Sequence, residues 1–233
     1  MSERWQTFVH GYVDRAGGPV PFALHQWEFL RPVYAAIRRA LPSGGRVLDV
    51  GCGAGIFTAL LAHHGYEVTG IDNDEDIVRY AGEMIDYLRA PAQVERGDAF
   101  DLAGYLDRFD LVYSLGVVEH FEPDVTVSLL REQARCAPRV LTVVPTAYTR
   151  YSADVTDERP YKRGEVVRMY KEAGLRVRES FVVGDVPTVL GAVMRRGLPA
   201  ILRDPIERRA SYGMGVCCVG EMLPAPPASS GGP

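Results

Sequence analysis

The chain has 233 residues, of which 47% are apolar and 24% charged, and it carries a formal net charge of −4. This length suits one α/β domain with a large buried core. The acidic balance argues against a nucleic-acid partner, which needs a basic surface, and no apolar run reaches the ~20 residues that span a membrane.

The N-terminus and the cysteines are typical of a protein that stays inside the cell. Residues 1–15 lack both the basic start and the apolar core of a signal peptide, so we expect a cytoplasmic location. The 4 cysteines form no C-x-x-C pair, which argues against a zinc site and a disulfide framework. Cys217 and Cys218 lie in an apolar run and are expected to be small core residues.

Residues 1–43 predict an N-terminal lid of two helices in front of the main domain. A first apolar stripe includes Trp5 and Tyr12, and the Gly-Pro-rich stretch 16–21 then interrupts the pattern. A second stripe runs from Trp27 to Leu41 and ends at the Pro-Ser-Gly-Gly turn of residues 42–45.

From residue 46 onward, short apolar strands alternate with amphipathic helices, which indicates a doubly wound parallel sheet. The expected strands are 46–50, 66–71, 92–96, 109–114, 138–144, 175–183 and 212–220. The expected helices are 55–64, 74–89, 121–136 and 164–173, with a short one near 101–107. The main domain accordingly covers 44–222. Segment 184–210 breaks the rhythm and predicts an inserted cap, and the composition of residues 223–233 predicts a disordered tail.

The strongest motif is Val-Leu-Asp-Val-Gly-Cys-Gly-Ala-Gly, residues 47–55, where a buried strand runs into glycines and a helix follows. Such a turn lets the backbone approach a ligand at the carboxyl end of the strand. The spacing of Gly51 and Gly53 differs from the Gly-x-Gly-x-x-Gly that places a pyrophosphate on a helix end. Asp49 is compatible with the cationic amino group of S-adenosylmethionine (SAM), whereas it is ill suited to a pyrophosphate. The turn therefore indicates SAM rather than a dinucleotide.

A second acidic position follows the second strand, in Gly-Ile-Asp-Asn-Asp, residues 70–74. Asp72 is placed to accept hydrogen bonds from both ribose hydroxyls of a nucleoside, and Asn73 would lie against the adenine. Asp74 and the acidic residues after it are expected to stabilise the N-terminus of the next helix.

A third acidic position follows the third strand, in Gly-Asp-Ala-Phe-Asp, residues 97–101. An adenine would lie here in such a fold, and Asp98 would accept a hydrogen bond from its exocyclic amine. The alternative is that Asp98 is a loop carboxylate that caps the short helix at residue 101.

These motifs, with Phe-Asp-Leu-Val-Tyr-Ser-Leu-Gly-Val-Val-Glu-His-Phe at residues 109–121, resemble class I SAM-dependent methyltransferases in order and approximate spacing. The resemblance covers residues 46–183. It implies a Rossmann-like sheet of seven strands with the last strand antiparallel. It also implies cofactor contacts from Asp49, Gly51, Gly53, Asp72, Asp98, Ala99 and Leu115. Residues 24–31 resemble the N-terminal helix of these enzymes, in which an arginine meets the SAM carboxylate. Arg31 holds that position, and a solvated helix residue is the alternative.

Residues 114–121 resemble the small-molecule O-methyltransferases of quinone biosynthesis and lack the Asp/Asn-Pro-Pro-Tyr/Phe motif of base N-methylases. Glu119 and His120 are the candidate catalytic residues, with His120 as general base. The alternative is a pair that only shapes the pocket. Some relatives bind magnesium through Glu-x-x-Glu-His. Because Gly116 holds the first glutamate position here, we expect no metal.

The sequence thus predicts methyl transfer from SAM to an oxygen, nitrogen or carbon atom of a small metabolite. An anionic acceptor is one hypothesis, because segment 184–210 contains five arginines, Arg195, Arg196, Arg203, Arg208 and Arg209. The alternatives are a non-catalytic binding subunit with the same fold and an NAD(P)-dependent oxidoreductase. No motif indicates an oligomeric state.

Overall fold

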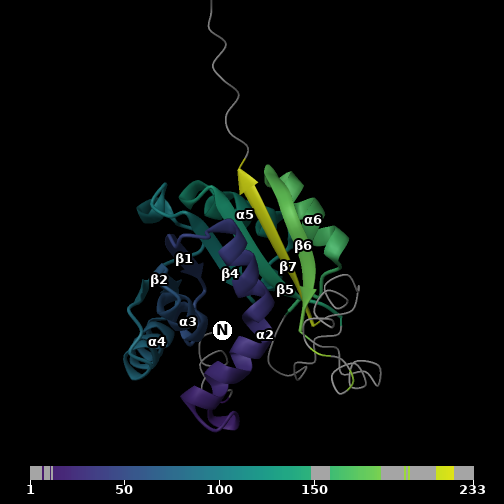
Figure 1. Ribbon diagram of the computed structural model, residues 1–233. Coiled ribbons are helices and arrows are strands. Elements are labelled where there is room, and N and C mark those ends of the chain that lie inside the picture. Colours follow the sequence, from purple (N-terminus) through teal and green to yellow (C-terminus); the bar gives the residue numbers. More distant parts are fainter. Residues whose placement is uncertain are drawn as a thin grey trace, which may run out of the picture.

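The fold is built on one seven-stranded sheet, in which six strands are parallel to one another and β7 is antiparallel to both its neighbours (Figure 1). The computed structural model describes residues 7, 11, 13–147, 158–184, 197, 199 and 214–222. The strand order is β3-β2-β1-β4-β5-β7-β6. The strands are β1 Arg46–Val50, β2 Glu67–Asp72, β3 Gln93–Arg96, β4 Leu111–Leu115, β5 Arg139–Pro145, β6 Leu175–Val183 and β7 Gly215–Met222. The predicted Rossmann-like sheet with an antiparallel last strand is confirmed.

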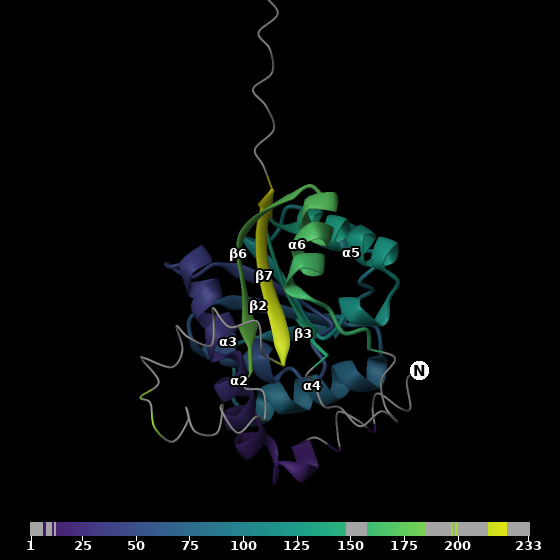
Figure 2. The ribbon, with the colours of Figure 1, turned by 90° about the vertical axis from the view of Figure 1, so that its right-hand side faces the viewer.

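Helices cover both faces of the sheet. They are α2 Pro19–Ala40, α3 Ile56–His63, α4 Glu75–Tyr87, α5 Pro123–Cys136 and α6 Arg163–Glu172. Figure 2 shows α2 and α3 on one side of the sheet and α5 and α6 on the other. Neighbouring residues of β5 point to opposite faces of the sheet, each of which has its own hydrophobic core. Leu141 packs with α2 and α3, whereas Val140 packs with α5 and α6. Because both faces are covered, the central strands are mostly apolar, and their polar residues Asp49, Ser114 and Thr142 are buried as well.

Two helical predictions need correction. Helix α2 begins at Pro19, so the interruption before it ends at Gly18, whose φ is 111°. Prolines are tolerated in a first helical turn because the N–H they lack has no partner there. The helix expected near 101–107 is only a single 3₁₀ turn, Ala103–Tyr105.

The C-terminal half of α2 packs as part of the main core. Val33 and Ile37 are fully buried against residues of α3 and the sheet, including Leu61 and Tyr113. The N-terminal half contributes side chains to the cavity described below. The core therefore includes residues on both sides of residue 43, and the division into a lid of residues 1–43 and a main domain of residues 44–222 stays a prediction.

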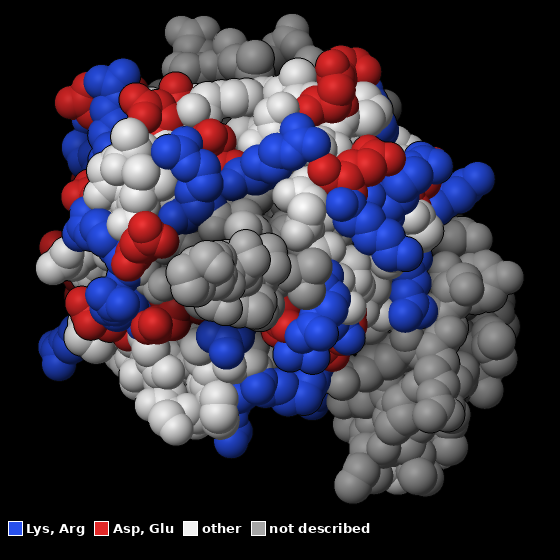
Figure 3. Space-filling model, turned by 90° about the horizontal axis from the view of Figure 1, so that it is seen from above, with Lys and Arg blue, Asp and Glu red and all other residues white. Residues whose placement is uncertain are grey.

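The inserted cap 184–210 and the tail 223–233 lie outside the described residues, apart from Gly184, Gly197 and Pro199. Within the described residues, no helix is both long enough and apolar enough to cross a membrane. On the face at the amino ends of the parallel strands, basic and acidic side chains are interspersed (Figure 3). Cys217 and Cys218 are fully buried in β7, as predicted.

Candidate functional site

A cavity of about 230 Å³ lies at the carboxyl ends of the central strands. The strand order reverses between β1 and β4, and open α/β sheets bind ligands at this switch point. The lining residues come from α2, from the end of β1 and the glycine turn, from the ends of β4 and β5 and the turn after β4, and from the stretches before α6 and β7. They include Phe22, Gln26, Phe29, Leu30, Asp49, Gly51, Cys52, Gly53, Leu115, Gly116, Glu119, Pro145, Glu158 and Met214. Of the residues predicted to bind cofactor, the structure thus brings Asp49, Gly51, Gly53 and Leu115 to one cavity.

The glycine turn requires glycine at its first position. Gly51 has a φ of 75°, and a Cβ added there would lie 2.4 Å from Cγ2 of Val117. Its N–H donates to the carbonyl of Ile71, which ties the turn to the end of β2. The turn therefore brings bare backbone to the cavity wall.

Asp49 is a buried carboxylate of β1 that faces this cavity. Its Oδ2 accepts hydrogen bonds from Oγ1 of Thr58 at 2.5 Å and from the hydroxyl of Tyr113 at 2.6 Å. Burial raises the pKa of Asp49 to about 7, although the two hydroxyl donors act to lower it. Among the described residues that line the cavity, none is a lysine or arginine. Asp49 therefore has no cationic partner among these residues. A cationic group of a ligand, such as the amino group of SAM, would supply one.

Asp72 joins the end of β2 to the glycine turn. Its Oδ2 accepts from the backbone N–H of Gly53 at 3.2 Å, and its Oδ1 from that of Asp74 at 3.2 Å. Burial raises the pKa of Asp72, and these hydrogen bonds oppose the rise. Asp74 itself caps α4, since its Oδ1 accepts from the N–H of Asp76 at 2.9 Å, as predicted. The hydrogen bonds of Asp72 to a ribose stay a prediction.

Four other predicted cofactor residues lie outside the cavity lining. Asn73 and Asp98 are exposed, and Oδ1 of Asp98 accepts from the N–H of Phe100 at 2.9 Å. The carboxylate that meets the 3₁₀ turn is that of Asp101, whose Oδ1 accepts from the N–H of Ala103 at 3.3 Å. Ala99 is half-buried and packs beside the cores on the α5 side of the sheet. Arg31 is exposed on α2, next to Leu30, which does line the cavity. Their cofactor contacts stay predictions.

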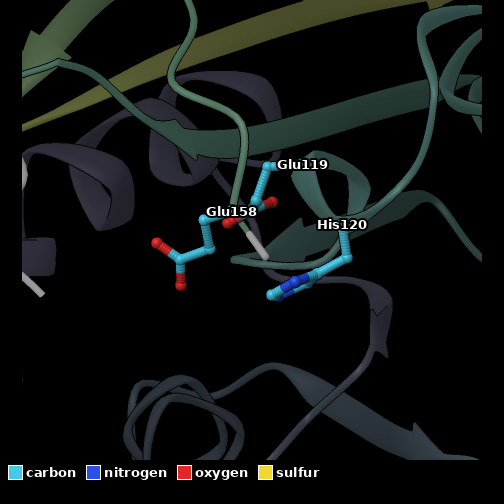
Figure 4. A group of neighbouring side chains, drawn as sticks. All are labelled: Glu119, His120 and Glu158. Atoms are coloured by element: carbon cyan, nitrogen blue, oxygen red, sulfur yellow. The ribbon is translucent and has the colours of Figure 1, made fainter. Parts of the chain in front are cut away.

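The acceptor side of the cavity contains a second buried carboxylate. Glu119 lies in the 3₁₀ turn Val118–His120, is only 2% exposed, and its Oε2 has no hydrogen-bond partner among the described residues. Burial raises its pKa to about 8. Glu158, just before α6, lines the same cavity, and burial raises its pKa to about 7. Figure 4 shows Glu119, His120 and Glu158 around one space, with donor atoms within 4.8 Å of one another.

Sequence reasoning missed several lining residues. Phe22, Gln26, Phe29 and Leu30 share one face of α2 at helical spacing, which is a signal the sequence does contain. Glu158 and Met214 come from segments far from the recognised motifs, and no local pattern marks them. Only the tertiary fold brings them to the cavity.

Comparison with known proteins supports the interpretation of these motifs as those of a methyltransferase. Residues 47–138 match the family model described as a methyltransferase domain. The ubiquinone biosynthesis O-methyltransferase of Azorhizobium caulinodans is 34% identical over 122 residues, 52% of this chain and 44% of that protein. The chain spans less than two thirds of the length of this relative and of the similar ones from Bacillus subtilis and Xanthomonas campestris.

Solved structures share the fold across nearly the whole chain. One is the magnesium protoporphyrin IX methyltransferase of Synechocystis with bound SAM, with a TM-score of 0.61, 17% identity, and coverage of 95% of this chain and 90% of that one. Another is the 1,6-didemethyltoxoflavin-N1-methyltransferase of Burkholderia thailandensis with bound S-adenosylhomocysteine, with a TM-score of 0.63, 18% identity, and coverage of 94% and 87%. From its motifs, sheet order and matches, the chain belongs to the class I SAM-dependent methyltransferases and is distantly homologous to the ubiquinone biosynthesis O-methyltransferases.

Proposed function

We propose that this chain transfers a methyl group from SAM to an oxygen, nitrogen or carbon atom of a small-molecule acceptor. One observation carries the proposal: a single cavity joins the glycine turn and Asp49 to Leu115, Gly116 and Glu119. Donor-binding and acceptor-binding groups thus border one space, which a methyl transfer between two bound molecules requires.

The residues of the chain divide between two sides of this cavity. When bound, SAM supplies a methyl group already activated on a sulfonium. On the donor side, Gly51 and Gly53 allow close approach of the backbone, Asp49 binds the amino group, and Asp72 binds the ribose. Leu115, which lines the cavity, and Arg31, Asn73, Asp98 and Ala99, which do not, complete the proposed cofactor set.

On the acceptor side, Glu119 and His120 orient the acceptor at the end of β4. A displacement at an activated methyl group depends chiefly on holding the reacting atoms close and in line. The orphaned Oε2 of Glu119 supports this role, because an acceptor group that donates to it would satisfy a buried oxygen. The proposed role of Glu119 and His120 is therefore to position the acceptor.

The described wall of the cavity favours a neutral or cationic acceptor. Its ionisable side chains include Asp49, Glu119 and Glu158, which are all carboxylic acids, and none is a lysine or arginine. The arginines of segment 184–210 lie outside the described residues, so the anionic acceptor is supported by the sequence alone. The names of the relatives describe small-molecule O- and N-methyltransferases, which supports a small-molecule acceptor here.

The test is a turnover assay with pooled acceptors. The purified chain is incubated with SAM and separate pools of phenols, carboxylic acids and amines, and S-adenosylhomocysteine and methylated products are followed by mass spectrometry. We expect acceptor-dependent release of S-adenosylhomocysteine from at least one pool, and its loss in Asp72→Asn. Tight SAM binding with no turnover in any pool would contradict the proposal and favour the non-catalytic alternative.

A further inference from the structure

The cluster of Glu119, His120 and Glu158 has the composition of a metal site. Each offers one ligand atom, and the three atoms lie within 4.8 Å of one another. Donor atoms bound to one ion at ~2.1 Å lie at most ~4.2 Å apart, so side-chain shifts of less than ~1 Å would place all three on one ion. Figure 4 shows the three side chains and the two segments from which they come.

The backbone holds the two contributing segments together. Glu119 and His120 belong to the 3₁₀ turn after β4, whereas Glu158 comes from the stretch before α6. The N–H of Arg159 donates to the carbonyl of Glu119 at 3.1 Å, and the N–H of Tyr161 donates to the carbonyl of Pro145 at 2.8 Å. Glu158 is therefore fixed beside Glu119 by main-chain bonds.

A second observation points to a ligand in this cluster. Oε2 of Glu119 is buried, faces the cavity, and has no hydrogen-bond partner among the described residues. Arg159, whose N–H bonds to the carbonyl of Glu119, places its guanidinium on Glu122 at 2.7 Å. A buried carboxylate oxygen without a partner is costly, and a bound cation would satisfy it.

We propose that Glu119, His120 and Glu158 bind a divalent transition-metal ion beside the cofactor cavity. Gly116 stands where some quinone-biosynthesis relatives have their first glutamate, and for that reason the sequence predicts no metal. Glu158 supplies the third ligand from a different part of the chain. One imidazole with two carboxylates suits Mn²⁺ or Zn²⁺ better than Mg²⁺ or Ca²⁺, which prefer oxygen alone.

Three protein ligands leave open coordination positions, as in catalytic metal sites. An acceptor oxygen or nitrogen would bind there, in the cavity that Glu119 and Glu158 share with Asp49. This role in orienting the acceptor rests on the proposed function. Binding of the ion itself does not, because it needs neither SAM nor acceptor.

Mn²⁺ binding to the chelator-treated full chain tests the site, with the electron paramagnetic resonance signal of the free ion as readout and no SAM present. We expect one Mn²⁺ per chain, and at least ~10-fold weaker binding in Glu158→Gln and in His120→Asn. Asp124→Asn is the matched control, because this neighbouring carboxylate is exposed and lies outside the cluster. It should bind Mn²⁺ as the wild type does.

Failure of the wild type to bind Mn²⁺ or Zn²⁺, or equal affinity in the wild type and Glu158→Gln, would overturn the proposal. Stabilisation by a simple alkylammonium without any metal binding would also overturn it, and would identify the cluster as a site for a cationic acceptor. Far-ultraviolet circular dichroism of each variant confirms that a loss of binding is not a loss of fold. A normal SAM-dependent thermal shift in Glu158→Gln would separate failure at this site from failure of the cofactor site.

Discussion

At the residue scale, the site depends on two glycines with different surroundings. Gly51 and Gly53 both have positive φ, 75° and 52°. A Cβ at Gly51 would meet Val117, whereas a Cβ at Gly53 would meet nothing within 4 Å. The two positions therefore separate the cost of backbone strain from the cost of a steric clash.

Gly53→Ala should lower the free energy of unfolding by about 1 kcal/mol, because alanine is disfavoured at left-handed φ. Gly51→Ala should lower it by roughly 1–3 kcal/mol more, because the new methyl group displaces Val117. Urea denaturation measures both, and Val117→Ala combined with Gly51→Ala should recover part of the difference. Equal losses in the two single variants would contradict the packing described around Gly51.

Asp49 makes the stability of the ligand-free protein depend on pH. Its pKa is raised from 3.8 to about 7 in the folded state, so the folded protein binds this proton more tightly than the unfolded chain does. The stability from this group is fully present below pH ~4 and is lost as pH rises toward 7.

Asp49→Asn removes this dependence. The free energy of unfolding of the variant relative to the wild type should rise by roughly 2–4 kcal/mol between pH ~4 and pH ~8, since each pKa unit corresponds to ~1.4 kcal/mol. Urea titrations of both proteins at the two pH values measure the difference, in which the other titrating groups cancel. A pH-independent difference would show that burial does not shift this carboxyl.

At the element scale, α2 serves both the core and the cavity. Its C-terminal half buries Ile37 completely, while its N-terminal half brings Gln26 to the cavity wall. The second stripe of apolar residues predicted this helix. Its start was not predicted, because the prolines of its first turn were interpreted as part of the interruption before it. Strands β1 and β6 were predicted to the residue, because glycines bound both of them: β1 is a short, mostly apolar run, whereas β6 alternates apolar and polar residues before it ends in the apolar residues 181–183.

The two halves of α2 should respond differently to truncation. Ile37→Ala should lower the free energy of unfolding by roughly 2–5 kcal/mol, because it leaves a cavity in the core. Gln26→Ala should lower it by less than ~1 kcal/mol, since this side chain is half-buried, and should change ligand affinity instead. Denaturation and calorimetry with S-adenosylhomocysteine measure the two effects. Global destabilisation by Gln26→Ala, with unchanged affinity, would contradict the assignment of the two halves.

At the scale of the whole molecule, the donor and acceptor sides differed in how far the sequence predicted them. The donor side is local: Asp49, Gly51 and Gly53 stand within five residues at the end of one strand, so their spacing alone indicates a ligand. The acceptor side joins Glu119 with Glu158 and Met214, which are distant in the chain and carry no common motif. Only the folded sheet brings them together.

The central claim is a SAM site at the carboxyl ends of β1 and β4, and a thermal shift with SAM, S-adenosylhomocysteine and NAD in parallel tests it most directly. A ligand at about 100 times its dissociation constant stabilises the fold by about 2.7 kcal/mol. We predict a higher melting temperature with both sulfur compounds, a smaller rise for both in Asp72→Asn, and no change with NAD. No shift with either sulfur compound in a folded sample, or a shift with NAD alone, would contradict the assignment of the glycine turn.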